Sequence, residues 1–162
     1  NFWWLDWVLN MSVKIREIDH EDLNFMLTIE NDKSNWKYGI NKTALSLEDA
    51  SDYIKQSKLM ILNNDNQRFV IEYNNTKAGL IDLYDYQFQN SFAKVGIIVL
   101  KKFRGKGIGD KSLKLLLKLC KNYLNINYLE SEIEKYNQPS INLFVNNNFK
   151  NISGNKYVHK AI

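Results

Sequence analysis

The chain has 162 residues, of which 44% are hydrophobic and 25% are charged, and its formal net charge is +4. This length suits one domain with a sizeable core, and the mild positive charge does not call for a nucleic-acid partner. One cysteine excludes an intramolecular disulfide, and one cysteine with two histidines offers no zinc site, so we expect no metal and a reducing, cytoplasmic setting.

The first ten residues, NFWWLDWVLN, are apolar and aromatic. They are too short to span a bilayer, and they lack the basic start and cleavage site of a signal peptide. A regular pattern begins at Met11. We therefore expect residues 1–10 to be upstream sequence outside the native protein, and residues 11–162 to form a single domain without a membrane partner. A hydrophobic anchor or a dimer contact is the alternative for residues 1–10, and a homo-oligomer is left open.

Residue periodicity predicts several elements in the first half of the chain. In order, these are a strand at 13–16, a helix from Asp19 to about Glu30, a polar loop at 33–46, a helix from Ser46 to about Lys58, and strands at 68–73 and 78–84. Asp19 and Asp22 have the spacing of a capping box. Asn74-Asn75 suits a tight turn between the last two strands.

The stretch 95–124 carries most of the functional information. An apolar run at 95–100 predicts a buried strand, and Gly105, Gly107 and Gly109 alternate with other residues after it. A helix follows, with one apolar face and lysines on the other. Cys120 falls on the apolar face, so we expect it to be a core residue rather than a nucleophile.

The glycine loop and the helix start predict an anion-binding site. The first N–H groups of a helix lack intrahelical partners and carry a partial positive charge, and glycines let an anion approach them closely. Basic residues surround the same point, namely Lys101, Lys102, Arg104, Lys106 and Lys111. A ligand with a pyrophosphate group fits this arrangement. A lysine-rich surface helix after a glycine turn is the alternative.

Two other phosphate motifs are absent from the sequence. No window matches the P-loop pattern, and the Rossmann pattern fails because the third glycine comes one residue early. Glu130 nevertheless stands about where a ribose-binding acid would be expected in a Rossmann unit.

The remaining sequence predicts a strand, a helix and a final hairpin. The strands are expected at 128–134, 149–152 and 157–161, with Gly154-Asn155 as the hairpin turn. The helix starts at 137–140, where a proline suits the first turn, and Asn147 or Asn148 can take a left-handed position at its end. The element order is therefore β-α-α-β-β-β-α-β-α-β-β.

Two motifs in this order resemble those of the Gcn5-related N-acetyltransferases, the GNAT family. The first is R-x-x-G-x-G at Arg104, Gly107 and Gly109, and the second is NQPSINLFVNNNF, which places Asn137, Ser140, Phe144 and Phe149 in the family register. The resemblance covers about residues 13–160. It implies an α/β fold of GNAT type, with a mixed, mostly antiparallel sheet, splayed central parallel strands and flanking helices.

Within the family, the chain is similar to bacterial spermidine N-acetyltransferases and to the acetyltransferases of ribosomal-protein N-termini. The segments IREIDHEDLNFMLTIENDKSNWKYG and QRFVIEYNNTKAGLIDLYDY carry this similarity. It implies acetyl-CoA as co-substrate and, as acceptor, a small amine such as a polyamine or else a peptide N-terminus. Two departures stand out, because Phe144 replaces the tyrosine that many members use as general acid and Lys94 stands where the spermidine enzymes carry an acid.

The resemblance also implies roles for individual residues. The cofactor-binding residues would be Ile98, Val99, Arg104, Gly105, Lys106, Gly107, Ile108, Gly109, Asn137, Ser140 and Phe144. A backbone N–H near Ile98 or Val99 would bind the developing oxyanion.

The acceptor side is less specific. Asp82 and Asp85 are the candidate general bases, Ser140 or a water would protonate the departing sulfur, and the acceptor would meet Glu30, Asp32 and Tyr84. Glu30, Asp32 and Glu72 are weaker candidates for the base. These acids are equally compatible with helix capping and a solvated strand end. A non-catalytic acyl-CoA sensor and a pure interaction module are the alternatives from other functional classes.

Overall fold

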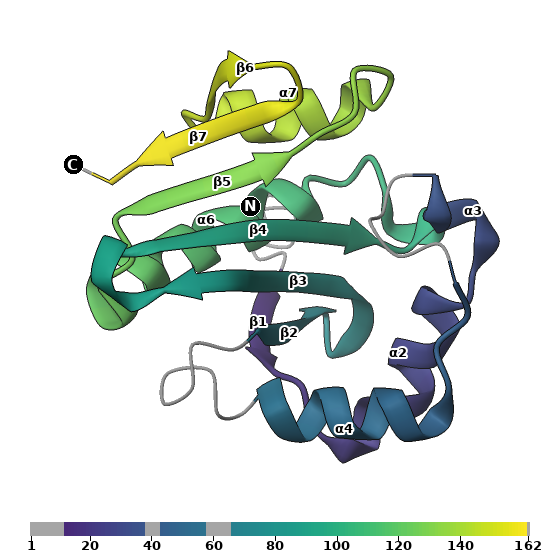
Figure 1. Ribbon diagram of the computed structural model, residues 1–162. Coiled ribbons are helices and arrows are strands. Elements are labelled where there is room, and N and C mark those ends of the chain that lie inside the picture. Colours follow the sequence, from purple (N-terminus) through teal and green to yellow (C-terminus); the bar gives the residue numbers. More distant parts are fainter. Residues whose placement is uncertain (1–11, 38–42, 58–65, 162) are drawn as a thin grey trace, which may run out of the picture.

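The computed structural model describes residues 12–37, 43–57 and 66–161, which form a seven-stranded sheet with helices on both faces (Figure 1). The strands are β1 (Val13–Glu17), β2 (Gln67–Tyr73), β3 (Thr76–Gln87), β4 (Phe92–Val99), β5 (Tyr128–Glu132), β6 (Lys150–Ser153) and β7 (Lys156–Lys160). The helices are α2 (Leu23–Glu30), α3 (Lys33–Trp36), α4 (Leu47–Ser57), α6 (Ile108–Leu119) and α7 (Gln138–Asn146).

The strand order is β1-β2-β3-β4-β5-β7-β6. All neighbouring strands are antiparallel except β4 and β5, which are parallel. This pair is short, because only 92–94 of β4 align with 128–130 of β5. Beyond these residues the two strands diverge, as Figure 1 shows. The predicted fold class, a mostly antiparallel sheet with splayed central parallel strands, is confirmed.

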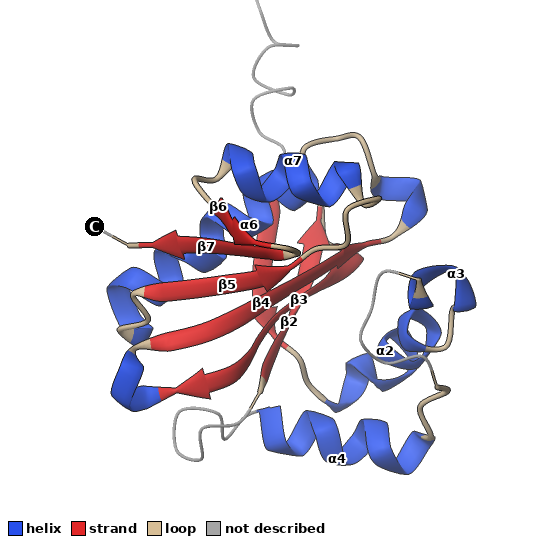
Figure 2. Ribbon diagram, turned by 45° about the horizontal axis from the view of Figure 1, so that its top comes forward, coloured by secondary structure: helices blue, strands red, loops and turns tan. Residues whose placement is uncertain are grey.

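Two hydrophobic cores pack against the two faces of the sheet, and helices lie on both faces (Figure 2). The larger core lies between the sheet and helices α6 and α7, where Leu113, Leu116 and Phe144 are buried. The smaller core lies under α2 and α4 and includes Met26 and Ile54. Residues of one strand alternate between these cores, as the two-residue period of a strand requires. Because a core lies on each face of the sheet, the place where β4 and β5 diverge lies between two packed layers.

Several predicted boundaries are corrected by the structure. The expected polar loop at 33–46 contains the one-turn helix α3, which starts with the Asp32 carboxylate accepting the backbone N–H of Ser34 at 2.9 Å. Strand β3 continues to Gln87 rather than ending at 84, and the helix at 108–119 ends in a π-helical turn at 120–124. The expectations for residues 1–10 and for the end of the second helix at Lys58 lie outside the described residues.

The predicted turns are confirmed by their backbone angles. Asn74 and Asn75 have φ values of 48° and 63°, and Asn148 has a φ of 65° after helix α7. Asparagine tolerates this left-handed region better than most residues, which explains its use at these three positions. Within the described part of the chain, no helix has the length and apolar character needed to cross a membrane.

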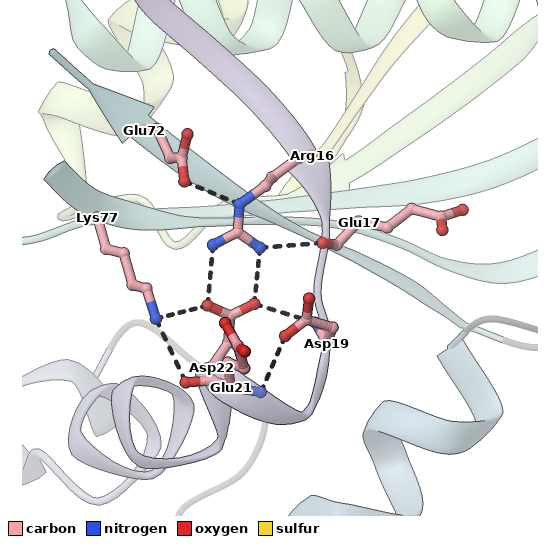
Figure 3. A network of polar contacts seen from close by, with 7 residues as sticks. All are labelled: Arg16, Glu17, Asp19, Glu21, Asp22, Glu72 and Lys77. Atoms are coloured by element: carbon pink, nitrogen blue, oxygen red, sulfur yellow. Dashed lines mark hydrogen bonds and ion pairs between the residues drawn. The ribbon is translucent and has the colours of Figure 1, made fainter. Parts of the chain in front are cut away.

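A buried polar network ties the start of the chain to the sheet (Figure 3). Asp22 is 0% exposed, and its two oxygens accept hydrogen bonds of 2.7 and 2.9 Å from the Arg16 guanidinium. Lys77 Nζ lies 2.6 Å from the same carboxylate, and the backbone N–H of Asp19 donates to it at 3.0 Å. The predicted capping box of Asp19 and Asp22 is thereby confirmed. The network joins β1, α2 and β3 at one point.

We expect Asp22→Asn to destabilise the protein at pH 7 by about 3 kcal/mol, the lower end for a broken buried pair, because Arg16 stays partly solvated. Burial opposes ionisation, but Arg16 and Lys77 outweigh it and hold the pKa of the Asp22 carboxyl well below its usual range. A carboxyl with a depressed pKa stabilises the fold above its unfolded pKa, and this stability is lost as the pH falls. The variant should therefore show a flatter dependence of the free energy of unfolding on pH below about pH 5.

Urea unfolding at several pH values measures this effect. Asp52→Asn is the matched control, because Asp52 is 57% exposed and its ion pair with Lys55 is long, at 3.4 Å. Such exposed pairs contribute about 0–1 kcal/mol. Equal losses in the two variants would contradict the structural role of the buried network.

Candidate functional site

A cavity of about 870 Å³ lies where β4 and β5 diverge. Most of the residues predicted to form the site line it, namely Glu30, Asp82, Tyr84, Asp85, Ile98, Val99, Arg104, Gly105, Gly107, Ile108, Gly109, Asn137, Ser140 and Phe144. Asp32, Glu72 and Lys106 are not among the described residues that line it. The sheet, both helix layers and the glycine loop therefore meet at one cavity.

The glycine loop has the open backbone that an anion site needs. Gly105 and Gly107 both have a φ of +76°, and no heavy atom of the described residues lies within 4 Å of the position that a Cβ would take. Gly107 is the N-cap of α6, and within the described part of the chain no side chain caps this helix start. The first N–H groups of α6 are therefore left for a ligand, and glycine is needed at both positions with positive φ.

The edge of β4 that turns away from β3 is open beyond residue 94, where the pairing with β5 ends. Residues 95–99 of this strand line the cavity. The backbone N–H of Leu100 donates to Ala78 of the neighbouring strand segment at 2.8 Å, and the Nε of Arg104 donates to the carbonyl of Val99 at 2.8 Å. Alternate residues of an antiparallel ladder direct their backbone groups to the same neighbour. The N–H groups of Ile97 and Val99 therefore point to the open edge, whereas that of Ile98 points to β3.

This geometry refines the sequence expectation for an oxyanion donor. Of the two expected positions, Val99 has its backbone N–H at the open edge and Ile98 has its N–H directed to β3. The N–H of Ile97, which was not among the expected positions, also points to the open edge. Strand pairing decides which N–H groups are open, and the sequence gives no signal for it.

The side chain of Lys106 lies beside the cavity rather than in its lining. Its Nζ lies 5.8 Å from the ring centroid of Tyr73 and 5.9 Å from that of Phe103. The two rings meet edge to face at 6.0 Å. The lysine therefore covers an aromatic pair beside the loop, instead of reaching into the cavity.

The end of the cavity that holds Asp82 and Glu30 is built around Arg68, a residue that sequence reasoning missed. Its Nε and Nη2 donate to the two oxygens of Asp82, each at 2.7 Å, and its Nη1 donates to Glu30 at 2.7 Å. Its guanidinium carbon lies 4.8 Å from the ring centroid of Tyr53. Burial opposes the charge, but Asp82 and Glu30 outweigh it and keep the pKa of the Arg68 guanidinium above its ordinary value.

A second cluster lies further along β3 and β4. Lys94 Nζ is 2.9 Å from Glu132 Oε1 and 3.3 Å from Asp85 Oδ2. The hydrogen bond to Glu132, which outweighs burial, and the contact with Asp85 together raise the pKa of the Lys94 ammonium above its ordinary value. Glu132 comes from β5 and was not predicted, because its approach to Lys94 depends on strand pairing. The lysine that replaces an expected acid therefore lies between two acids.

Tyr84 stands beside these two clusters. A Cβ added to Gly96 would lie 3.7 Å from Cε1 of the Tyr84 ring, so the ring covers the bare backbone of β4. Burial, reinforced by the charge of Glu132, raises the pKa of Tyr84 to about 12. The tyrosine therefore presents a protonated hydroxyl near neutral pH.

Helix α7 closes the far side of the cavity. Phe144 is 1% exposed and packs edge to face against Phe149, with ring centroids 4.9 Å apart. Asn137 caps the helix through its side-chain oxygen, which accepts the backbone N–H of Ser140 at 3.4 Å. The Ser140 hydroxyl has no hydrogen-bond partner among the described residues. Ser140 is the hydroxyl-bearing residue of the second motif among those that line the cavity.

Two weaker candidates for the base lie elsewhere. Glu72 accepts a hydrogen bond of 2.8 Å from the Nε of Arg16 and belongs to the network of Figure 3. Asp32 is occupied as the N-cap of α3. No cluster of three or more histidine, cysteine or acidic side chains within the described ranges is arranged to hold a metal ion.

Comparison with known proteins agrees with these observations. A family model described as acetyltransferase (GNAT) domain matches residues 12–150. Spermidine N(1)-acetyltransferase of Escherichia coli (strain K12) is 27% identical over 133 residues, covering 82% of this chain and 70% of that protein.

Solved structures share the fold. Spermidine N-acetyltransferase from Vibrio cholerae, in complex with CoA and spermine, superposes with a TM-score of 0.77 at 20% identity, covering 90% of this chain and 91% of that one. The ribosomal L7/L12 alpha-N-protein acetyltransferase RimL, in complex with CoA, gives a TM-score of 0.80 at 17% identity, with 93% and 94% of the two chains covered.

We expect Arg68→Met to destabilise the protein by about 3–5 kcal/mol, because it leaves two carboxylates at a buried position without their cation. The Arg68 side chain is only 10% exposed. Urea unfolding measures the loss, and Lys55→Met, which breaks an exposed pair on α4, is the control with an expected loss below about 0.5 kcal/mol. A loss at Arg68 as small as that of the control would show that Glu30 and Asp82 do not need this cation.

Proposed function

The chain belongs to the GNAT acetyltransferase family, and we propose that it transfers the acetyl group of acetyl-CoA directly to a cationic primary amine, a polyamine such as spermidine. The observation that carries this proposal is the single cavity of about 870 Å³, which has the glycine loop at one end and a wall of carboxylates at the other.

The loop at 104–109 and the start of α6 fit the pyrophosphate of acetyl-CoA. Both loop glycines with positive φ leave the space beside the backbone free of side-chain atoms, and the helix start contributes N–H groups and a partial positive charge. Arg104 adds a guanidinium whose terminal nitrogens have no hydrogen-bond partner among the described residues. Acetyl-CoA supplies the activated acetyl group, and these residues bind and orient it.

The acceptor end favours a cation. Four carboxylates meet there, those of Glu30, Asp82, Asp85 and Glu132, against the two cations Arg68 and Lys94. The excess negative charge attracts an ammonium group and raises its local concentration. The charge excess supports an amine acceptor of positive charge over a neutral one.

The amine must lose a proton before it can act as a nucleophile, because its free pKa is near that of lysine. Of the two predicted bases, Asp85 is the more available. Both oxygens of Asp82 accept hydrogen bonds from Arg68, whereas the Asp85 carboxylate, among the described residues, has one ion pair, with Lys94 at 3.3 Å. Asp85, directly or through a water, is therefore our candidate base.

The remaining roles fall to the open edge and to α7. The N–H groups of Ile97 and Val99 are placed to donate to a carbonyl oxygen that gains negative charge. Phe144 has no proton to give. Ser140, which lines the cavity, is the candidate donor to the departing sulfur, with a water as the alternative.

A transfer assay with a panel of amines tests the proposal. Acetyl-CoA is incubated with the protein and with spermidine, spermine, a peptide N-terminus or a neutral amide, and release of CoA is followed. Turnover with the polyamines supports it. Turnover with the peptide alone would assign the chain to N-terminal acetylation, and binding of acetyl-CoA without any turnover would indicate a sensor.

We expect Gly107→Val to abolish acetyl-CoA binding, because a β-branched residue is strained at a φ of +76° and its side chain would occupy the approach to the α6 N-terminus. Titration calorimetry measures the affinity. The control is Gly154→Val in the β6–β7 turn, where the φ is +52° and the glycine is not among the described residues that line the cavity. A folded Gly107→Val protein that binds acetyl-CoA normally would refute the loop assignment.

We expect Asp85→Asn to reduce turnover with spermidine by roughly 100-fold or more, the lower range for loss of a general base. Affinity for acetyl-CoA should stay unchanged, because Asp85 lies at the acceptor end. Steady-state kinetics over a range of pH measures both effects. Asp82→Asn serves as the comparison, with a thermal melt to detect any loss of the Arg68 pair, and a large loss there with a normal Asp85→Asn variant would move the role of base to Asp82.

A further inference from the structure

A carboxylate stands in the helix turn where a bound pyrophosphate would lie. Asp110 is the third residue of α6 and the only acid in its first turn, and it lines the cavity. The positive end of a helix attracts negative charge within the first turn. Asp110 and an anionic ligand would therefore compete for the same electrostatic potential.

The Asp110 carboxylate is held in place by two helices. Its Oδ2 accepts a hydrogen bond of 2.6 Å from Lys114 Nζ, and its Oδ1 accepts one of 2.9 Å from Asn147 Nδ2. Asn147 is 4% exposed, and its amide also donates to the carbonyl of Leu143 at 2.8 Å. The carboxylate, whose side chain is 37% exposed, is thus held between α6 and the residue that follows α7.

The same contacts keep the group ionised. The hydrogen bond from Lys114, against a smaller effect of burial and with help from Asn147, holds the pKa of the Asp110 carboxyl below its ordinary value. The N-cap of the helix is Gly107, which has no side chain to cap it. Asp110 acts on the helix end through its charge, because the hydrogen bonds of its carboxylate within the described residues go to Lys114 and Asn147.

We propose that Asp110 is a built-in counter-anion, which stabilises α6 in the free protein and opposes the pyrophosphate of acetyl-CoA and CoA. The inference rests on the proposed function of the loop at 104–109. Its consequence is a lower affinity for the nucleotide than a neutral helix start would give, and a faster release of CoA after each transfer. Product release limits the turnover of many enzymes, so a residue that speeds it has a clear advantage.

Asp110→Asn tests the inference, because asparagine keeps the shape and an acceptor oxygen but removes the charge. Calorimetry at low salt should show CoA binding about 3- to 10-fold more tightly than in the wild type. The melting temperature without ligand should fall by about 1–4 °C, because the helix loses its favourable anion. A purely structural role would lower stability and affinity together. Tighter binding in a less stable protein is therefore the specific signature.

Two controls complete the experiment. Asp52→Asn makes the same charge change on α4, where Asp52 pairs with Lys55 at 3.4 Å, and it should leave CoA affinity unchanged. In 0.5 M salt, about the range where the Debye length falls to a few ångströms, the difference between Asp110→Asn and the wild type should shrink. An unchanged or weaker CoA affinity in Asp110→Asn at low salt would overturn the inference.

The outcome is separable from that of the proposed function. If Gly107→Val abolishes CoA binding while Asp110→Asn binds like the wild type, the loop assignment stands and the counter-anion does not. If Gly107→Val binds CoA normally, the loop assignment itself is wrong.

Discussion

The divergence of β4 from β5 after residue 94 creates the site. Where two strands pair, their backbone groups satisfy each other, and an unpaired edge within a folded domain needs other partners. One such partner is Arg104, whose Nε donates to Val99. The arginine of the first motif thus supports the open edge while its charge stays at the mouth of the cavity. The N–H groups that remain on this edge are available because the sheet is incomplete.

A single bulge sets the electrostatics of the acceptor end. The turn pairs Tyr73 with Thr76, and continued without a break this register would place Arg68 opposite Ile81. The bulge between Ile71 and Glu72 shifts the ladder by one residue, so Arg68 pairs with Asp82. Such a shift moves a side chain to a different partner and a different face. The ion pair that limits Asp82 as a base is therefore a consequence of strand geometry.

The sequence allowed accurate prediction at several positions where structure depends on a few neighbouring residues. The loop glycines, the Asn74-Asn75 turn and the proline in the first turn of α7 are local features with fixed backbone demands. The partners of charged side chains could not be predicted, because they come from distant strands. Lys106 illustrates the limit, since the motif does not show that its side chain lies over Tyr73 of a distant strand.

Opposite charges at the two ends of one cavity suit a reaction between an anionic donor and a cationic acceptor. Gathering four carboxylates at the acceptor end would strain the fold by mutual repulsion and desolvation. Arg68 and Lys94 reduce the repulsion, because each forms ion pairs with two of the acids. Four carboxylates and two cations leave a modest excess of negative charge. At the donor end the charges are reversed, and Asp110 moderates the positive helix start there. At both ends a fixed side chain of opposite charge stabilises the protein in the absence of ligand. The ligand is attracted by the part of the electrostatic potential that this side chain does not neutralise.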